Sequence, residues 1–137
     1  MGTASTKDIR VARLVTTRVA TVDVQADALS ALRLLVSEPT PCVIVCREGT
    51  PVGVVTLRDL GVACAVHWPD LSRMQLRVEQ IMSSPLIEVS PDAKLTDLIP
   101  VLSSAEIECL TVMSQGKLVG VLERGKVLRA CLRMLVP

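Results

Sequence analysis

Aromatic residues are almost absent from this 137-residue chain, which has no phenylalanine, no tyrosine and a single tryptophan, Trp68. Proteins that hold single-stranded nucleic acids stack the bases on aromatic rings, and this chain cannot supply such a platform. Its hydrophobic content is nevertheless 50%. The interior must therefore be filled mainly by aliphatic side chains, cysteine and methionine, and the composition argues against disorder.

An excess of positive charge and a long apolar run are also missing. Fifteen basic residues face fourteen acidic ones, so the formal net charge is +1, whereas nucleic-acid-binding surfaces usually carry a basic excess. The longest apolar run, 60–66, is far shorter than the roughly 20 residues of a membrane-spanning helix. No apolar signal segment opens the chain, although Met1-Gly2 followed by Thr6 fits the loose N-myristoylation pattern as an alternative to a plain polar tail. We expect a cytoplasmic protein with no nucleic-acid partner and no membrane span.

Catalytic constellations are missing as well. His67 is the only histidine, and no catalytic triad or phosphate-binding loop surrounds it. Cys64 lies three residues before His67, but no second pair completes a zinc site. The odd number of cysteines without a signal segment favours free thiols in a reducing compartment; they are Cys42, Cys46, Cys64, Cys109 and Cys131. We expect no enzyme, no metal site and no required cofactor, and a cysteine-based redox sensor is kept as a minor alternative.

What the chain has instead is an internal repeat. Residues 49–60 (GTPVGVVTLRDL) align with residues 116–127 (GKLVGVLERGKV). Upstream, Val24 is paired with Val89, and the shorter spacing of that pair implies two one-residue insertions in the second copy. We expect an N-terminal tail at 1–9, a first repeat at 10–67, a connector at 68–80 and a second repeat at 81–137.

Each copy reads as strand, helix, strand, strand, helix. In the first copy we expect strands at 21–24, 42–46 and 51–57, a helix capped by Asp27 and a second helix at 58–67. In the second copy we expect strands at 86–89, 109–113 and 118–122, and helices at 95–102 and 125–135. The predicted fold class is α/β of the α+β kind: two pseudo-symmetric β-α-β-β-α repeats packed through their sheets.

Two motifs carry a resemblance to a known family. Residues 89–95 (VSPDAKL) and 53–59 (GVVTLRD) resemble the signature elements of the CBS domain (cystathionine-β-synthase domain), which occurs as tandem pairs called Bateman modules. The resemblance covers about residues 10–135. It implies a non-catalytic regulatory module that binds an adenosine-containing ligand: AMP, ADP, ATP or an S-adenosyl compound.

The resemblance places that ligand at the start of the helix that follows the second motif. Thr56 and the helix N-terminus suit a phosphate, Asp59 can accept both hydroxyls of a ribose, and Arg58 lies between them. An ordinary capped helix start explains the same residue types. The pocket walls would come from the second repeat, from Pro85, Leu86, Ile87, Ile107, Glu108, Cys109 and Leu110. Plain core packing is the alternative role for each apolar wall residue.

The second copy departs from the family pattern. Glu123 stands where a threonine or serine is expected, and Lys126 replaces the aspartate. A carboxylate repels a phosphate, and an ammonium cannot accept a hydrogen bond from a ribose. We therefore expect one nucleotide site per chain. The alternative function is a protein-interaction or structural module whose ligand sites have decayed.

The partner expected beside a ligand is a second copy of the chain. The helix after Asp59 reads LGVACAV at 60–66 and is apolar on every face. The resemblance implies that such helices pair two chains into a homodimer. Because no catalytic segment is present in the sequence, the output would act in trans on an unidentified effector protein.

Overall fold

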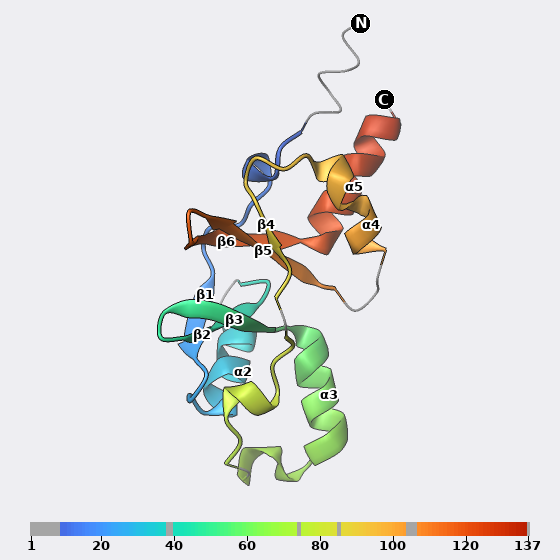
Figure 1. Ribbon diagram of the computed structural model, residues 1–137. Coiled ribbons are helices and arrows are strands. Elements are labelled where there is room, and N and C mark those ends of the chain that lie inside the picture. Colours follow the sequence, from blue (N-terminus) through green and yellow to red (C-terminus); the bar gives the residue numbers. More distant parts are fainter. Residues whose placement is uncertain (1–8, 38–39, 74, 85, 104–106, 137) are drawn as a thin grey trace, which may run out of the picture. The chain divides into compact units, whose positions relative to one another are not determined.

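The computed structural model describes residues 9–37, 40–73, 75–84, 86–103 and 107–136 (Figure 1). The chain folds into two compact units. One unit contains residues 18–86, and the other combines residues 1–17 with residues 87–137. We call them the first-repeat unit and the second-repeat unit, because each contains the strands and helices of one repeat.

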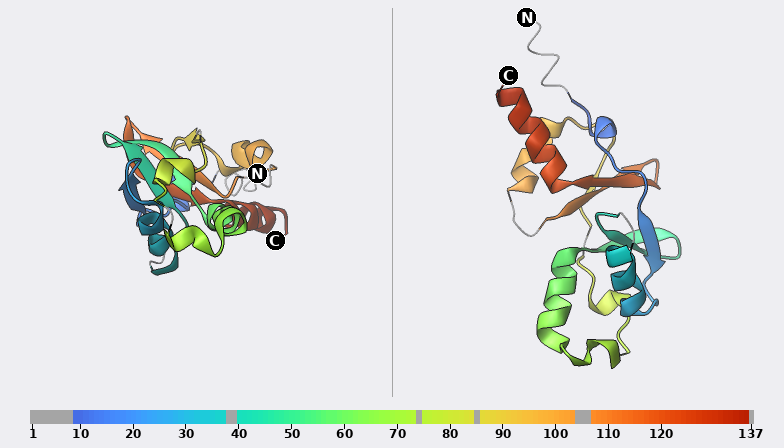
Figure 2. Two further views of the ribbon diagram at one scale, coloured as in Figure 1. Left: turned by 90° about the horizontal axis from the view of Figure 1, so that it is seen from below. Right: turned by 180° about the vertical axis from the view of Figure 1, so that it is seen from behind.

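The first-repeat unit is built on a three-stranded sheet in the order β1-β2-β3. Strand β1 runs parallel to β2, which requires a crossover through a helix, and β2 runs antiparallel to β3. Its elements are β1 (Ala20–Asp23), α2 (Ala28–Ser37), β2 (Val43–Arg47), β3 (Thr50–Val55), α3 (Leu57–His67), η2 (Asp70–Arg73) and η3 (Val78–Gln80). Figures 1 and 2 show α2 and α3 on the same side of this sheet.

The second-repeat unit repeats this plan with the sheet order β4-β5-β6. Its elements are η1 (Val11–Arg13), β4 (Glu88–Val89), η4 (Leu95–Leu98), α4 (Ile99–Leu102), β5 (Cys109–Ser114), β6 (Lys117–Glu123) and α5 (Arg124–Leu135). The prediction of one continuous helix at 95–102 is wrong in one respect, because Leu95–Leu98 form a 3₁₀ turn before the α-helix begins. Pro100 lies in the first turn of α4, where its missing N–H group costs no intrahelical hydrogen bond.

The two hairpins have turns of the same conformation. Glu48 and Gly49 connect β2 to β3 with φ angles of 50° and 81°, and Gln115 and Gly116 connect β5 to β6 with φ angles of 51° and 75°. Two successive positive φ angles match the right-handed twist of antiparallel strands, and glycine adopts the second one without steric cost.

The register of the strands corrects the alignment of the two copies. Val22 pairs with Val45 in the first-repeat unit, and Val89 pairs with Val112 in the second. Val89 is therefore equivalent to Val22, and the pairing with Val24 made from the sequence is wrong. The same spacing now relates the first strands and the hairpins, so the alignment needs no insertion between them.

A short lead-in segment precedes each repeat and packs into the unit that holds the other repeat. Val78 of η3 is fully buried in the first-repeat unit, where its N–H group donates to the carbonyl of Ala26 at 2.8 Å. Val11 of η1 is fully buried in the second-repeat unit, where its N–H group donates to the carbonyl of Ala93 at 2.9 Å. The boundaries between the two compact units therefore differ from the boundaries between the two sequence repeats.

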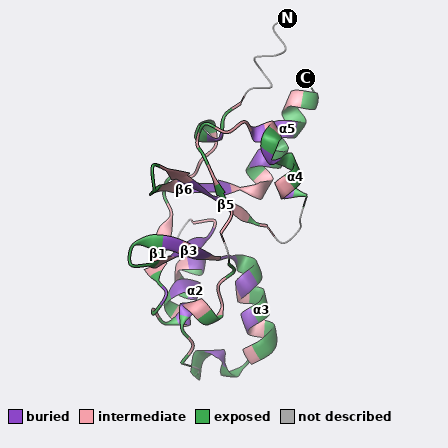
Figure 3. Cartoon of the chain, in the orientation of Figure 1, coloured by how far each residue is buried: buried purple, intermediate pink, exposed green. Residues whose placement is uncertain are grey.

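Each unit has an aliphatic core between its sheet and its helices (Figure 3). Val43, Val45 and Val55 are fully buried in the first-repeat unit, and Leu110 and Leu122 are fully buried in the second. Trp68 contributes to neither core, because 74% of its surface is exposed. Within the described ranges, no helix combines the length and the apolar character that crossing a bilayer would require.

Candidate ligand site

The motif GVVTLRD forms the junction between β3 and α3. Strand β3 ends at Val55, Thr56 is the N-cap with extended backbone angles of −120° and 175°, and α3 begins at Leu57. Asp59 at the third helical position completes a capping box with Thr56. Both side chains are buried, with 5% of Thr56 and 8% of Asp59 exposed. The capped helix start considered as the alternative interpretation of these residues is therefore present.

Three donors hold the Asp59 carboxylate. The Thr56 N–H group donates to Oδ2 at 2.8 Å, and the Thr56 hydroxyl donates to the same oxygen at 3.2 Å. The Ser83 hydroxyl donates to Oδ1 at 2.7 Å. Because the side chain is fixed from both oxygens, its orientation is set before any ligand arrives.

Ser83 is a residue of this site that sequence reasoning missed. Its backbone is fastened to β3, since Ser83 N–H donates to the carbonyl of Val54 at 2.8 Å and Val54 N–H donates back at 3.0 Å. Gly53 permits the close approach, because a Cβ there would meet the side chain of Met82. The available signal was the repeat itself, which places Thr16, another hydroxyl residue, at the equivalent position of the second-repeat unit.

The start of α3 offers donors and positive charge next to Asp59. The first N–H groups of a helix have no acceptor within the helix and carry the positive end of its dipole. Leu57 and Arg58, the first two helical residues, are both exposed. The junction can therefore present backbone donors, the Thr56 hydroxyl and a guanidinium to an anionic group, with a carboxylate beside them.

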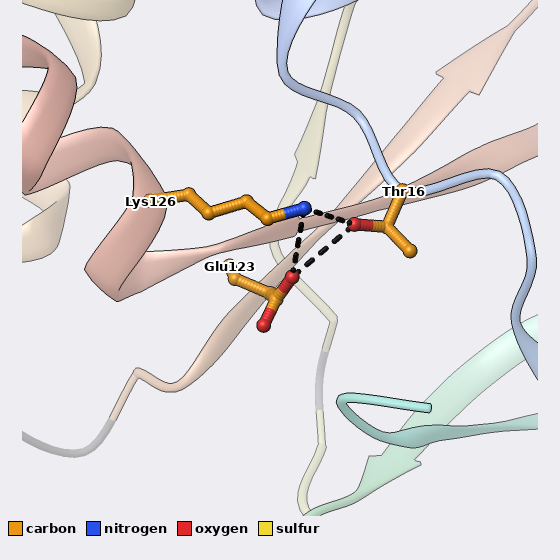
Figure 4. A network of polar contacts seen from close by, with 3 residues as sticks. All are labelled: Thr16, Glu123 and Lys126. Carbon is orange, nitrogen blue, oxygen red and sulfur yellow. Dashed lines mark hydrogen bonds and ion pairs between the residues drawn. The ribbon is translucent and has the colours of Figure 1, made fainter. Parts of the chain in front are cut away.

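The equivalent junction in the second-repeat unit has a different polar network (Figure 4). Strand β6 ends at Glu123, and α5 begins at the next residue. The Thr16 hydroxyl donates to Glu123 Oε2 at 3.2 Å, and Lys126 Nζ donates to the Thr16 hydroxyl at 3.1 Å. Lys126 Nζ also lies 3.3 Å from Glu123 Oε2. The carboxylate at this junction therefore has a cation beside it.

Thr16 reaches this junction in the way that Ser83 reaches the first. Thr16 and Val121 exchange backbone hydrogen bonds at 2.8 and 2.9 Å. A Cβ at Gly120 would meet the carbonyl of Thr16, so glycine is needed there for the two backbones to approach.

The residues expected to form the walls are distributed over both units. Leu86 belongs to the first-repeat unit, and Ile87, Ile107, Cys109 and Leu110 belong to the second-repeat unit. Pro85 lies outside the described residues. Leu110 is fully buried in the core, while Ile87 and Ile107 are partly buried against that core. Their packing role is therefore present, and their role as pocket walls stays a prediction.

The cysteines and the single histidine do not gather into a site within the described residues. No group of three metal-ligating side chains occurs there, and none of the five thiols is in a disulfide. Burial raises the pKa of the Cys46 thiol, and the negative charge of Asp23 raises it further. Burial also raises the pKa of the Cys131 thiol. A raised pKa reduces the thiolate fraction, which disfavours both thiols as redox sensors.

An open groove of about 570 Å³ lies elsewhere in the first-repeat unit. Its lining residues come from the segment between β1 and α2, the first turn of α2, η2 and the segment before η3; they are Gln25, Asp27, Leu29, Ser72, Arg73, Gln75, Leu76 and Arg77. Neither Thr56 nor Asp59 lines this groove.

Comparison with protein families and known proteins gives concordant matches. A family model described as CBS domain matches the chain twice, over residues 11–62 and 78–133. The CBS domain-containing protein YhcV of Bacillus subtilis (strain 168) is 27% identical over 110 residues, which span 80% of this chain and 76% of that protein.

Solved structures of similar fold cover nearly the whole chain. The crystal structure of CBSX2 in complex with AMP aligns with a TM-score of 0.71 and 28% identity, over 92% of this chain and 98% of CBSX2. The CBS-domain containing protein ATU1752 from Agrobacterium tumefaciens aligns with a TM-score of 0.74 and 21% identity, over 88% of this chain and 90% of that one. An uncharacterized conserved protein from Pyrococcus horikoshii aligns with a TM-score of 0.76 and 21% identity, over 91% of this chain and 93% of that one.

Proposed function

Because the chain belongs to the CBS domain family, we propose that it is a non-catalytic regulatory module that binds an adenosine-containing ligand at the junction of β3 and α3. The resemblance seen in its two motifs is confirmed by the two family matches. The observation that carries the proposal is the buried Asp59 carboxylate, held in one orientation beside the N-terminus of α3. A similar chain, CBSX2, was crystallised with AMP.

The chemistry of the junction matches the parts of a nucleotide. An ionised carboxylate accepts hydrogen bonds from the hydroxyls of a ribose. The helix N-terminus, the Thr56 hydroxyl and the exposed Arg58 suit a phosphate. The base would lie against apolar side chains; the family resemblance alone names Leu86, Ile87, Ile107, Cys109 and Leu110 for this role.

The output of such a module would be a change in how it contacts a partner. A ligand shifts a conformational equilibrium only by its differential affinity for the two states, so the partner must read a state that the ligand stabilises. We assign α3 to a homodimer contact, because Val62 and Val66 are 55% and 67% exposed and only Asp59 and Ala63 of this helix are buried. Sedimentation as a monomer at tens of micromolar, about the range of a modest interface, would contradict the dimer.

Isothermal titration calorimetry tests the ligand. We expect heat of binding from at least one of AMP, ADP, ATP and S-adenosylmethionine. Asp59→Ala is expected to weaken that binding by about tenfold or more, because hydrogen bonds to a charged group are lost. Asp59→Asn preserves the shape of the side chain and should weaken binding as well, since one acceptor oxygen becomes a donor.

Asp97→Asn is the matched control for this experiment. Asp97 is an exposed acid in η4 of the second-repeat unit, so the variant removes the same charge at a position outside the proposed site. It should bind as the wild type does. Ligand binding that Asp59→Ala and Asp59→Asn leave unchanged would refute this site.

A protein-interaction module is the second candidate function. It is favoured by the junction in the second-repeat unit, where Lys126, Glu123 and Thr16 contact one another and the expected aspartate is missing. This candidate predicts no heat with any of the four ligands, together with an unchanged oligomeric state in their presence.

A further inference from the structure

We propose that the Thr56 hydroxyl couples phosphate recognition to ribose recognition, by leaving the Asp59 carboxylate when a phosphate binds and so opening an acceptor site for a ribose hydroxyl. This inference rests on the proposed nucleotide site and specifies how that site selects its ligand. It follows from the number of donors already present on one carboxylate.

The Asp59 carboxylate has about four lone-pair positions on its two oxygens. Three donors use it: the Thr56 N–H group and the Thr56 hydroxyl on Oδ2, and the Ser83 hydroxyl on Oδ1. About one acceptor position remains, on Oδ1. A ribose brings two neighbouring hydroxyls, so one resident donor must leave before both can bind to this carboxylate.

The three donors differ in how easily they can leave. The Thr56 N–H group is part of the N-cap of α3, and its 2.8 Å bond is fixed by the backbone. Ser83 makes the shortest bond, at 2.7 Å, from a backbone that is held by a pair of hydrogen bonds to Val54. The Thr56 hydroxyl makes the longest bond, at 3.2 Å, and its oxygen can turn away from Oδ2 by rotation about the Cα–Cβ bond. The geometry therefore selects the Thr56 hydroxyl as the donor that is exchanged.

A phosphate supplies the reason for the exchange. A hydroxyl that donates to a phosphate oxygen at the helix N-terminus keeps a charged acceptor, so the hydroxyl loses little by turning away from Asp59. The position vacated on Oδ2 then accepts the second ribose hydroxyl. Phosphate and the ribose diol should bind cooperatively, and by linkage each strengthens the other by the same factor.

A series of nucleosides and nucleotides tests this coupling on the wild-type protein. Dissociation constants are measured for adenosine and AMP and for the 2′-deoxy and 3′-deoxy forms of each, by calorimetry or, for weak ligands, by ligand-observed NMR. Removing one of the two ribose hydroxyls should reduce the affinity for AMP about tenfold more than it reduces the affinity for adenosine. This is the usual effect of one hydrogen bond to a charged group. Because this series needs no substitution, it is independent of whether a variant folds.

Variants test whether the hydroxyl donors on Asp59 cause the coupling. Thr56→Val removes the hydroxyl and leaves a position on Oδ2 open. The loss of affinity caused by removing one ribose hydroxyl, here called the deoxy penalty, should then be equal for adenosine and AMP. Thr56→Ser keeps a hydroxyl and should keep the coupling. Ser83→Ala leaves two open positions on Oδ1, so both ribose hydroxyls fit without an exchange and the coupling should be lost there as well.

Each outcome decides the proposal. Equal deoxy penalties in the wild type, for both the 2′ and the 3′ hydroxyl, would overturn the coupling while the proposed nucleotide site stands. Coupling that survives in Thr56→Val would overturn it, because the Thr56 hydroxyl could not then be the donor that is exchanged. If AMP does not bind, this inference is overturned, whether or not S-adenosylmethionine binds.

Discussion

The two junctions between the last strand and the last helix of each repeat share the same backbone arrangement. They differ in where the carboxylate lies and in the lysine that accompanies it in the second repeat. In both, a hydroxyl residue from the lead-in segment pairs with the last strand, Ser83 with Val54 and Thr16 with Val121. In both, that hydroxyl donates to a carboxylate. The carboxylate is at the third helical position in the first-repeat unit and at the N-cap in the second.

This shift of one acid changes what the junction can bind. Asp59 is 8% exposed, and the three donors that hold it are neutral groups, so its negative charge remains for a ligand to use. Glu123 has a lysine at 3.3 Å, and the side chains of Lys126 and Glu123 are 45% and 34% exposed. An exposed pair of this kind contributes little stability. Its consequence is that the charge of Glu123 is compensated by a side chain one helical turn away.

The largest expected effect tests the shared backbone. Gly120→Ala should destabilise the protein by about 2–3 kcal/mol, because the new Cβ would meet the carbonyl of Thr16 and the Val15 side chain. Gly53→Ala should cost less, about 1 kcal/mol, since the closest atom belongs to the flexible side chain of Met82. Urea denaturation measures both.

Gly61→Ala is the control for these two variants. Gly61 lies within α3, and a Cβ there would have no neighbour within 4 Å. Alanine favours a helix over glycine by about 1 kcal/mol, so this variant should be as stable as the wild type or more stable. If Gly120→Ala were no more destabilising than Gly53→Ala, the close approach of Thr16 would not limit the fold.

The second prediction compares the two carboxylate networks. Asp59→Ala should cost about 2 kcal/mol, because three hydrogen bonds to a buried carboxylate are lost. Lys126→Ala should cost about 0.5 kcal/mol or less, the usual range for an exposed ion pair. The free energy of unfolding from urea titration separates the two. Equal costs would mean that burial does not distinguish these junctions.

The third prediction converts one junction into the other. The double variant Glu123→Thr with Lys126→Asp gives the second-repeat unit the residue pair of the first. Thr16 should then donate to the introduced carboxylate at position 126 as Ser83 donates to Asp59, and the number of ligands bound per chain should rise from one to two in calorimetry. Lys126→Asp alone is the control, because two acids at this junction would still repel a phosphate. An unchanged stoichiometry in the double variant would show that these two residues do not decide whether the junction binds.

Much of the fold follows from local patterns in the sequence. The hairpin glycines, Gly49 and Gly116, require φ values that few other residues adopt, so their turns were predictable. The register of the first strands was not, because Val24 and Val22 are both apolar and only pairing with β2 distinguishes them. The 3₁₀ turn before α4 was also missed, although Pro100 was a signal for it.

The candidate site was predictable only as far as neighbours in sequence determine it. Thr56 and Asp59 are three residues apart at a helix start, so a capping box brings them together by itself. Ser83 meets Asp59 through a lead-in segment that pairs with β3, and no short motif encodes that contact. The walls from the second repeat rest on the family resemblance alone.

The smallest expected effect compares one cysteine from each unit at alkaline pH. The pKa of Cys46 is raised above its ordinary value of 9.0 by burial and by Asp23, and the pKa of Cys131 is raised by burial. An unfolded thiol therefore loses its proton at a lower pH than the folded one. Above that pH the unfolded state binds fewer protons, so the stability that these thiols contribute is complete below it and falls as pH rises further.

Cys46→Ala should accordingly reduce the loss of stability between about pH 7.5 and pH 10, a window that spans the titration of an ordinary thiol. Cys131→Ala should reduce this loss as well, because burial raises the pKa of that thiol. Urea midpoints at the two pH values measure the difference, and comparison with the wild type removes the contribution of lysine titration. If Cys46→Ala and the wild type lost the same stability between the two pH values, the raised pKa of Cys46 would be contradicted.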